Sequence, residues 1–560
     1  MAKMNGAQMV VKSLEAEGVD TIFGLPGGTV IHLYDAIYDS KINHVLMRHE
    51  QAASHAADGY ARVSGKPGVC IATSGPGATN LVTGIATANL DSVPMVAITG
   101  QVATTMIGTD AFQEADIMGA TIPLVKHSMQ VRTPEQIPVA VKKAFYIAST
   151  GRPGPVLIDV PADVQKGFGE FKYPQSISFP GYDPERGADL SQLDAAVSLL
   201  EHAERPVIFA GGGVIRSGAA GKLTELAEKL EIPVVTSLLG KGSFPESHPL
   251  GLSLGMAGMH GHPVANRALM TADVILAVGS RFSDRSTGKR SSFASEAKII
   301  HIDLDPAEID KAIESEVWLV GDAGKIIDAI RKSISKKYFD RSNWLEELEL
   351  IRQKEPLPRN EYAGEIAPWQ VIETLREITG GKSVLTTEVG QHQMWAALHY
   401  KVEEPRRFVT SGGLGTMGFG FPSAIGAALA CPGQHVCCIA GDGSFMMNIQ
   451  ELDTCARYNI PVKVFILNNS CLGMVRQWQQ LFYEHRYSNT IYNRNPDFVK
   501  IAEGMGVSGF SATRPEEIRK TIEAALKVPG PALVDFRIPQ GALVLPMVPP
   551  GGSIDKMILN

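Results

Sequence analysis

Apolar runs alternate with segments of helical spacing along most of the chain. In the first third, short runs at residues 69–73, 95–99 and 156–161 are separated by such segments, and the same alternation returns around residues 205–213 and in the last third. Strands that alternate with helices in this way form parallel sheets that are covered by helices. The pattern therefore predicts an α/β protein of three domains, each a mostly parallel sheet flanked by helices.

Segments rich in polar residues, proline and glycine separate the three predicted domains. The final segment, residues 541–560, is expected to lie outside the core, where it could fold over a site. We expect domains at residues 1–165, 191–340 and 368–540, with linkers at residues 166–190 and 341–367.

The most informative stretch contains two apolar runs, at residues 436–440 and 462–467. The first run ends in Gly441-Asp442-Gly443, the second ends in Asn468-Asn469, and a segment of helical spacing joins them. Two strands joined by a helix are expected to be parallel neighbours, with their carboxyl ends side by side. Ligands bind at that edge of open α/β sheets. A carboxylate, an amide oxygen and glycines there suit a Mg²⁺ ion that carries a diphosphate.

Composition limits the kinds of partner. The chain has 560 residues, of which 44% are hydrophobic and 20% charged, as in ordinary soluble proteins of several domains. A net charge of −7 argues against nucleic acid and acidic membranes as partners. We find neither a signal-peptide pattern nor an apolar run of the roughly 20 residues that span a membrane. The six cysteines lack zinc-ligand spacing and are expected to be reduced, mostly buried thiols in a cytoplasmic protein.

A Gly-Asp-Gly sequence alone would fit a plain turn, but its pairing with Asn-Asn resembles the cofactor motif of thiamine diphosphate (ThDP) enzymes. The resemblance implies that Asp442, Asn469 and the backbone carbonyl of Cys471 hold the metal. It also implies a pyrimidine-binding first domain, a central domain that resembles FAD-binding domains, and a diphosphate-binding last domain. The implied cofactor contacts of the last domain are Val389, Gly390, Gln391, His392, Gly441, Gly443, Ser444 and Gly473.

Glu50 stands where an apolar run gives way to a helix rich in small residues. A carboxylate at the start of a helix is usually a capping group. The resemblance implies instead that Glu50 hydrogen-bonds the aminopyrimidine ring and promotes the tautomer that removes the thiazolium C2 proton. It also implies that Met417 keeps the cofactor bent and that the Gly415 carbonyl contacts the pyrimidine amino group, although Met417 alone would fit an ordinary core position. The loop at residues 74–80 is expected to be scaffold.

Across all three domains the resemblance is closest to the catalytic large subunits of acetohydroxyacid synthase, also called acetolactate synthase. The implied reaction decarboxylates pyruvate and joins the hydroxyethyl unit to a second 2-ketoacid. Pyruvate would give 2-acetolactate, and 2-ketobutyrate would give 2-aceto-2-hydroxybutyrate, in the first common step of valine, leucine and isoleucine biosynthesis. The runs that carry the resemblance are IFGLPGG, IGTDAFQEAD, GMAGMHG, RFSDRSTGK, EVGQHQMW, GMVRQWQQLFYEHRYS and LPMVPPGG.

Further site residues follow from this resemblance alone. Arg285 matches the arginine that pairs with the carboxylate of the second substrate, and Trp478 matches a tryptophan that favours 2-ketobutyrate. Without the resemblance, Arg285 could be a surface arginine and Trp478 an anchor or interface residue. Phe112 and Gln113 match groups near the reacting centre. FAD is expected beside ThDP and Mg²⁺, at Gly211, Gly212, Met259, His260, Arg281, Asp303 and Asp322.

The chain departs from the usual pattern at three positions. Ala162 replaces a lysine near the site entrance, and Ser283 and Glu388 stand where aspartate is usual. A flavin-independent catabolic acetolactate synthase stays an alternative, although the RFSDR run favours the biosynthetic form. A pyruvate oxidase and a non-catalytic assembly protein are weaker alternatives. A glyoxylate carboligase is disfavoured, because that enzyme has no glutamate at the position that corresponds to Glu50.

The resemblance also implies an assembly. ThDP sites of this kind form between subunits, with Glu50 from one chain and Asp442 and Asn469 from the other. We therefore expect a homodimer or a homotetramer, with a regulatory small subunit as a possible further partner.

Overall fold

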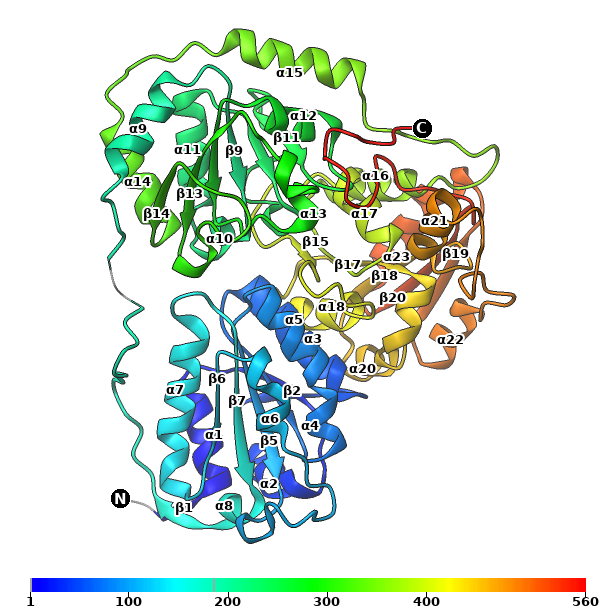
Figure 1. The fold of residues 1–560 in the computed structure, drawn as a ribbon. Coiled ribbons are helices and arrows are strands. Elements are labelled where there is room, and N and C mark those ends of the chain that lie inside the picture. Colours follow the sequence, from blue (N-terminus) through cyan, green and yellow to red (C-terminus); the bar gives the residue numbers. More distant parts are fainter. Residues whose placement is uncertain (1–2, 185–186) are drawn as a thin grey trace.

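The computed structural model describes residues 3–184 and 187–560. Residues 1–2 and 185–186, which belong to the predicted first domain and first linker, lie outside the described residues. Figure 1 shows three α/β bodies, each built on a parallel sheet with helices against it. The predicted fold class is therefore confirmed.

The first body holds a six-stranded sheet. Its strands are β2 (Thr21–Gly24), β3 (Asn43–Leu46), β4 (Gly68–Ala72), β5 (Met95–Gln101), β6 (His127–Gln130) and β7 (Pro155–Pro161). They lie in the order β3-β2-β4-β5-β7-β6, and the paired strands run parallel. The helices of this body include α1 (Gly6–Ala16), α3 (Glu50–Ser64), α4 (Pro76–Asn80), α5 (Val82–Leu90) and α7 (Ile137–Ser149).

The central body repeats this plan. Its strands are β9 (Pro206–Ala210), β10 (Val234–Thr236), β11 (Ser253–Met256), β12 (Val274–Val278), β13 (Lys298–Asp303) and β14 (Val317–Val320). Their order is β11-β10-β9-β12-β13-β14, again parallel. The helices include α9 (Leu193–His202), α10 (Gly212–Arg216), α11 (Ala220–Leu230), α12 (Pro263–Thr271), α13 (Asp284–Thr287) and α14 (Ala323–Ser333).

The last body has the third parallel sheet. Its strands are β15 (Val384–Thr387), β16 (Phe408–Thr410), β17 (Val436–Gly441), β18 (Val462–Asn468), β19 (Ser508–Ala512) and β20 (Ala532–Arg537), in the order β16-β15-β17-β18-β20-β19. Every residue of β17 and β18 is buried, as expected for strands covered on both faces. The helices include α16 (Pro368–Thr379), α17 (Gln391–His399), α18 (Gly420–Ala430), α19 (Asp442–Phe445), α20 (Glu451–Tyr458), α21 (Gly473–Phe482), α22 (Phe498–Gly504) and α23 (Ile518–Lys527).

In each sheet, the chain first adds strands on one side of the first strand of that sheet and then turns to its other side. The strand orders put this switch between β2 and β4, between β9 and β12, and between β15 and β17. The loops that leave two neighbouring strands there diverge, which opens a crevice at their carboxyl ends. Gly211–Gly213 and the residues after β12 lie at the second switch, and residues 388–392 and 441–444 lie at the third.

The first and last bodies are joined through helices α3 and α18. A Cβ atom added at Gly59 would lie 2.1 Å from the Ser423 carbonyl oxygen, and one added at Gly426 would lie 1.8 Å from the Ala56 carbonyl oxygen. The helices therefore approach more closely than side chains at these two positions would permit. Residues of both bodies share one hydrophobic cluster around this contact.

The final segment belongs to the core, so the prediction that it lies outside was wrong. Val544 packs in the cluster of the last body, and Val548 and Ile554 pack in a cluster of the central body. The Val548 N–H donates to the Met259 carbonyl oxygen at 2.8 Å. Prolines and glycines stop this segment from forming regular structure, but its apolar side chains are still buried. Figure 1 shows the segment running beside the central and last bodies.

The two predicted linkers contain regular structure. β8 (Phe168–Glu170) pairs antiparallel with β1 (Lys3–Asn5), and α15 (Ser342–Lys354) buries Trp344 and Leu348 against the central body. The predicted domain limits stay a prediction. Among the described residues, none of the helices is long and apolar enough to cross a membrane.

Candidate active site at the junction of three domains

The predicted metal site lies where β17 and β18 end. The two strands pair in parallel, as predicted from the sequence, and Asp442 begins helix α19 directly after β17. The side-chain amide of Asn495 donates to Asp442 Oδ2 at 2.6 Å and to Asn468 Oδ1 at 2.8 Å. Burial raises the pKa of Asp442 to about 6, against the effect of the Asn495 hydrogen bond. Asp442 is therefore a desolvated carboxylate held in place by a neutral amide.

Asn469 lies beside the loop that follows β15. Its side-chain amide donates to Gln391 Oε1 at 2.9 Å, and Gln391 in turn donates to Gln477 Oε1 at 2.9 Å and to the Ala542 carbonyl oxygen at 2.8 Å. Ser470 has a φ of +56°, so the chain turns sharply after the two asparagines. The turn brings Cys471 back beside the site, where it forms an isolated bridge with Ile491.

Glycines keep space open around these groups. A Cβ atom at Gly441 would lie 2.7 Å from His392 Nδ1, and one at Gly473 would lie 2.1 Å from Gln391 Oε1. His392 Nε2 is buried and has no hydrogen-bond partner in the described part of the chain. A buried carboxylate, nearby amide oxygens and an unpartnered buried imidazole nitrogen fit a bound metal–diphosphate group.

A metal here would depend on few side-chain acids. The described residues contain no group of three or more His, Cys, Asp or Glu side chains that could hold a metal ion. The predicted ligands, Asp442, Asn469 and the Cys471 carbonyl, supply oxygen atoms and one carboxylate. Hard oxygen ligands of this kind suit Mg²⁺ bound together with substrate phosphates better than they suit zinc.

Glu50 is the first residue of α3, but it does not cap that helix. The cap is His49, whose Nδ1 accepts the Gln51 N–H at 3.1 Å. Glu50 is buried, and its Oε2 accepts a hydrogen bond from the Asn80 side-chain amide at 3.0 Å. The carboxylate is thus aimed across the carboxyl edge of the first sheet and is not used to close its own helix. The sequence pattern predicts only a scaffold loop at residues 74–80 and does not reveal the role of Asn80.

The loop before Asn80 brings Gln113 to the same place. A Cβ atom at Gly77 would lie 3.2 Å from Glu50 Oε1, and one at Gly75 would lie 2.9 Å from the Gln113 carbonyl oxygen. Gln113 has a φ of +60°, and the side chain of its neighbour Phe112 is 88% exposed. Glu50, Asn80 and Gln113 therefore form one half-site, which we call the pyrimidine half because of the role predicted for Glu50.

A cavity of about 750 Å³ lies between the three bodies. This volume is in the range of cofactor pockets. Leu90, Asp91 and Arg152 line it from the first body, and the other two bodies supply the rest of its wall. The predicted site residues that line it are Gly212, Met259, His260, Arg281, Arg285, Asp303, Asp322, Val389, Gly390, Gly415 and Trp478.

The central body provides a glycine-rich wall for this cavity. A Cβ atom at Gly211 would lie 2.1 Å from the Gly279 carbonyl oxygen, so the backbones after β9 and β12 touch. His260 Nδ1 lies 2.9 Å from the Pro546 carbonyl oxygen, and burial lowers the pKa of His260 to about 4. His260 is thus neutral near pH 7 and links the final segment to this wall. The glycine backbone and the volume of the cavity fit a dinucleotide such as FAD.

Arg285 and Trp478 face this cavity from different bodies. Arg285 lies in helix α13, which follows β12. Its side chain is 61% exposed, and its Nη1 lies 3.4 Å from Met259 Sδ. Trp478 projects from α21 and packs edge-on against Phe482, with ring centroids 5.9 Å apart. The structure therefore brings together two residues that are far apart in sequence and were predicted to select the second substrate.

Other predicted residues are not brought into that cavity within one chain. Its lining includes neither the pyrimidine half nor Phe112, Met417 or Asp442. Met417 lies on the loop between β16 and α18, two residues after Gly415, which does line the cavity. Glu388, which stands where aspartate is usual, is fully buried and does not line the cavity. Its Oε2 accepts the Gly420 N–H at 2.8 Å, and burial raises the pKa of Glu388 to about 7.

Comparison with known proteins agrees with this arrangement. Family models of the thiamine pyrophosphate (ThDP) enzymes match the chain as an N-terminal TPP binding domain at residues 4–120, a central domain at residues 193–330 and a C-terminal TPP binding domain at residues 388–536.

Curated relatives match nearly the whole chain. The probable acetolactate synthase large subunit of Methanocaldococcus jannaschii is 50% identical, over 99% of this chain and 95% of that protein. The acetolactate synthase large subunit of Corynebacterium glutamicum is 49% identical, over 98% of this chain and 89% of that protein, and the one of Buchnera aphidicola is 46% identical, over 100% and 99%. The chain therefore belongs to the thiamine pyrophosphate enzymes and, within them, to the family of acetolactate synthase large subunits.

Proposed function

We propose that this chain decarboxylates pyruvate and joins the remaining hydroxyethyl unit to a second 2-ketoacid, as the biosynthetic enzyme of valine, leucine and isoleucine formation. One observation carries the proposal beyond the family. Arg285 and Trp478 line the same cavity as Val389, Gly390 and Gly415 of the cofactor loops. A cation and an apolar ring beside a cofactor suit a substrate with a carboxylate and a short alkyl group.

ThDP, when bound, supplies a thiazolium carbon that acts as an electron sink for decarboxylation. Glu50 is proposed to exchange a proton with the aminopyrimidine ring, and the hydrogen bond from Asn80 would orient its carboxylate. Met417 is proposed to support the bent cofactor, and the Gly415 carbonyl to accept from the pyrimidine amino group. The diphosphate would be held by Gly390, Gln391, His392, Gly441, Gly443, Ser444 and Gly473.

Mg²⁺ is the proposed metal, with Asp442, Asn469 and the Cys471 carbonyl as its protein ligands. FAD is the proposed occupant of the central part of the cavity, next to Gly212, His260 and Arg281. The other residues proposed to contact FAD are Gly211, Met259, Asp303 and Asp322.

Arg285 is proposed to bind the carboxylate of the second ketoacid. Its closest acidic neighbour, Asp284, is 3.7 Å from the Arg285 Nε, and both side chains are exposed. Such a pair is weak in water, which leaves the guanidinium donors free for a substrate. Trp478 is proposed to favour the larger alkyl group of 2-ketobutyrate, and Gln113 and Phe112 to approach the reacting centre.

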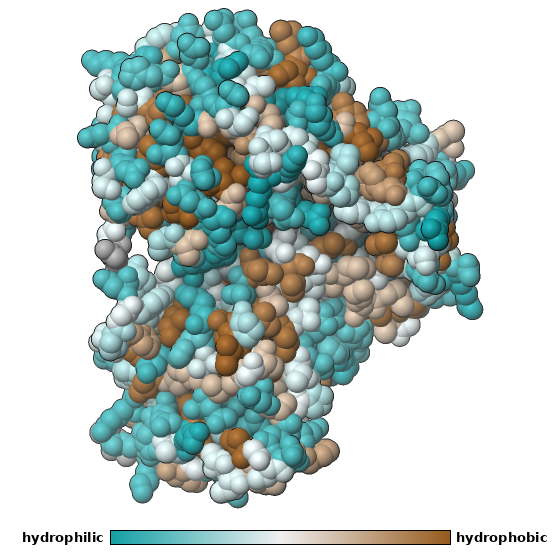
Figure 2. Space-filling model, in the orientation of Figure 1, coloured by the Kyte–Doolittle hydropathy of each residue, from teal (hydrophilic) through white to brown (hydrophobic). Residues whose placement is uncertain are grey.

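A second copy of the chain would complete the site. The pyrimidine half lies in the first body, the metal ligands lie in the last, and Phe112 is a large apolar side chain exposed beside Gln113. Figure 2 shows further hydrophobic patches on one face, some of them at the junction of the three bodies. A homodimer or homotetramer is therefore proposed, and the name "large subunit" of the relatives supports a small subunit as partner. The six free thiols agree with a cytoplasmic protein, which stays a prediction.

The test is incubation of the purified chain with pyruvate, ThDP and Mg²⁺, with and without FAD, followed by measurement of acetolactate. We expect acetolactate to form when FAD is present. When 2-ketobutyrate is added as well, we expect more 2-aceto-2-hydroxybutyrate than acetolactate. Acetolactate at full rate without FAD would select the catabolic alternative. Reduction of the flavin by pyruvate at the rate of turnover would select a pyruvate oxidase.

A further inference from the structure

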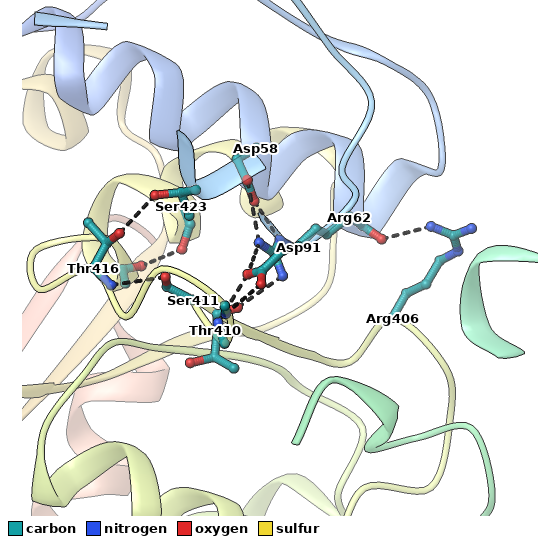
Figure 3. Close-up of polar contacts among 12 residues, drawn as sticks. Asp58, Arg62, Asp91, Arg406, Thr410, Ser411, Thr416 and Ser423 are labelled. Carbon is teal, nitrogen blue, oxygen red and sulfur yellow. Dashed lines mark hydrogen bonds and ion pairs between the residues drawn. The ribbon is translucent and has the colours of Figure 1, made fainter. Parts of the chain in front are cut away.

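A buried cluster of charged residues lies where the three bodies meet (Figure 3). In it, the Arg62 guanidinium donates to Asp58 Oδ1 at 2.5 Å through Nε and to Asp91 Oδ2 at 2.8 Å through Nη2. Its Nη1 donates to the Thr410 carbonyl oxygen at 2.9 Å. The side chains of Asp58 and Asp91 are completely buried, and that of Arg62 is 11% exposed. All three nitrogens of the Arg62 guanidinium group therefore donate hydrogen bonds, which fixes the orientation of this planar group.

Asp91 links all three bodies. Its carboxylate accepts the Gly412 N–H at 3.0 Å and the Gly413 N–H at 2.6 Å, in the loop that follows β16. Its carbonyl oxygen accepts a hydrogen bond from the Arg216 guanidinium of the central body. The cluster thus contains two carboxylates and two guanidinium groups. Removal of Arg62 would leave the buried carboxylates of Asp58 and Asp91 without the guanidinium that pairs with both, which is costly.

The loop that Asp91 holds forms part of the cavity wall. Residues 411–415 line the cavity, and Gly415 is the proposed contact of the pyrimidine amino group. A Cβ atom at Gly413 would lie 2.8 Å from Leu90 Cβ and 2.9 Å from Asp91 Oδ1, so the loop presses directly on the end of α5. A loop with glycines at positions 412, 413 and 415 has little stiffness of its own. Its shape must come from the groups around it.

A second contact holds the other end of the loop. The Thr416 hydroxyl lies 2.8 Å from the Thr87 hydroxyl, and the Thr416 N–H donates to Ser411 Oγ at 3.0 Å. Thr87 lies in α5, one turn before Asp91 at its end. Helix α5 of the first body therefore binds both ends of a cofactor loop that belongs to the last body.

We propose that Asp91 and Arg62 are positioning residues that preset the loop at residues 411–416 for ThDP. The first body would then act on ThDP twice, through the pyrimidine half and, within the same chain, through this loop. The inference rests on the proposed contact between Gly415 and ThDP. Because the loop would already be ordered before ThDP binds, the free energy needed to order it would not reduce the affinity for ThDP.

The test compares the full-length variants Asp91→Asn, Arg62→Lys and Thr87→Val with the wild type. Arg341→Lys is the matched control, because the buried guanidinium of Arg341 donates to three backbone carbonyls of the central body, at Leu200, Ala203 and Leu230, none of which lines the cavity. Three quantities are measured: the ThDP dissociation constant by calorimetry with Mg²⁺ present, hydrogen exchange of residues 411–416 without cofactor, and the thermal midpoint.

We expect Asp91→Asn and Arg62→Lys to weaken ThDP binding about tenfold, as loss of a hydrogen bond to a charged group would do, and to speed exchange in the loop. At saturating ThDP their kcat should return close to the wild-type value. Arg341→Lys should lower the thermal midpoint and leave ThDP binding unchanged. Thr87→Val, which removes one hydroxyl, should weaken binding less and decides the matter if Asp91→Asn does not fold.

Unchanged ThDP binding in folded Asp91→Asn, Arg62→Lys and Thr87→Val would overturn the proposal. Equal weakening by Arg341→Lys would also overturn it, since general loss of stability would then explain the effect. A wild-type chain that binds no ThDP would overturn the proposed function together with this inference, whereas unchanged variants of a ThDP-binding wild type overturn the inference alone.

Discussion

The side-chain amide of Asn80 donates to Glu50 Oε2 at 3.0 Å, across the carboxyl edge of the first sheet. Glu50 lies in α3, Asn80 lies at the end of α4, and Gly77 leaves room for the carboxylate between them. An amide donor stabilises the charged form of a carboxylate and fixes its direction. The pair is therefore suited to present one carboxylate oxygen to a ligand while the other is held.

Asn80→Ala should lower kcat about tenfold, because a hydrogen bond to a charged group is worth about 1.4 kcal/mol or somewhat more. Glu50→Ala should lower it by about 10² or more, as loss of a proton-transferring group does. Steady-state kinetics with pyruvate measures both, and circular dichroism checks that the fold is retained. Thr79→Ala, in the same short helix but exposed, is the control and should keep wild-type activity. Wild-type turnover by Glu50→Ala would contradict the assignment.

Asn495→Ala should raise the Mg²⁺ concentration for half-maximal activity about tenfold. The amide of Asn495 holds Asp442 Oδ2 at 2.6 Å, and loss of a group that orients a metal ligand typically costs 10- to 100-fold in affinity. Calorimetric titration of Mg²⁺ in the presence of ThDP measures the Mg²⁺ affinity directly, without turnover. Asn493→Ala, two residues away and exposed, serves as control. Equal Mg²⁺ affinity in both variants would show that Asn495 does not orient the metal ligand.

Glu388→Gln should change how stability depends on pH. Burial raises the pKa of Glu388 to about 7 from its ordinary value of 4.5, so the folded protein binds this proton more tightly than the unfolded chain. Stability therefore falls as pH rises from about 4.5 to about 7 and levels off above that pH. The free energy of unfolding of the wild type relative to Glu388→Gln should fall by up to about 1.4 kcal/mol per pH unit within this window. Unfolding of the cofactor-free protein by urea at several pH values measures it, and parallel curves would contradict the prediction.

Gly426→Ala should destabilise the protein by about 3 kcal/mol or more, since the new methyl group would lie 1.8 Å from the Ala56 carbonyl oxygen and force α3 and α18 apart. Gly221→Ala is the matched control. Gly221 lies in α11, is exposed and has no atom within 4 Å of the added Cβ, so alanine there should stabilise by about 0.5–1 kcal/mol. Thermal unfolding distinguishes the two, and a similar midpoint for both variants would argue against the tight helix contact.

The fold was predictable because strands buried on both faces leave a strong signal. The apolar run of β17 and the polar residues that follow it define both a strand and its carboxyl edge, so the neighbourhood of Asp442 and the end of β18 could be inferred without a structure. The place of Glu50 at the start of a helix was equally visible. The pattern could not show that His49 caps that helix, because a capping bond is decided by one rotamer.

The contacts between distant segments could not be predicted. Asn80, Asp91 and Asn495 are ordinary polar residues in loops or at helix ends, and only the packing of the three bodies reveals what each one holds. The burial of the final segment was missed for a related reason. Turn-forming residues predict only the local conformation of the backbone. The burial of Val548 depends on a surface of the central body, which is distant in sequence.

The burial of Val548 and Ile554 against the central body also has a consequence for the order of folding. Their cluster contains Phe209 and Ile275 from β9 and β12, which leave the ribosome long before the final segment is made. During synthesis the part of this cluster that Val548 and Ile554 cover therefore stays uncovered until the final segment has emerged. A nascent chain stalled before residue 541 should present an apolar surface that chaperones bind, and release of the full chain should cover it.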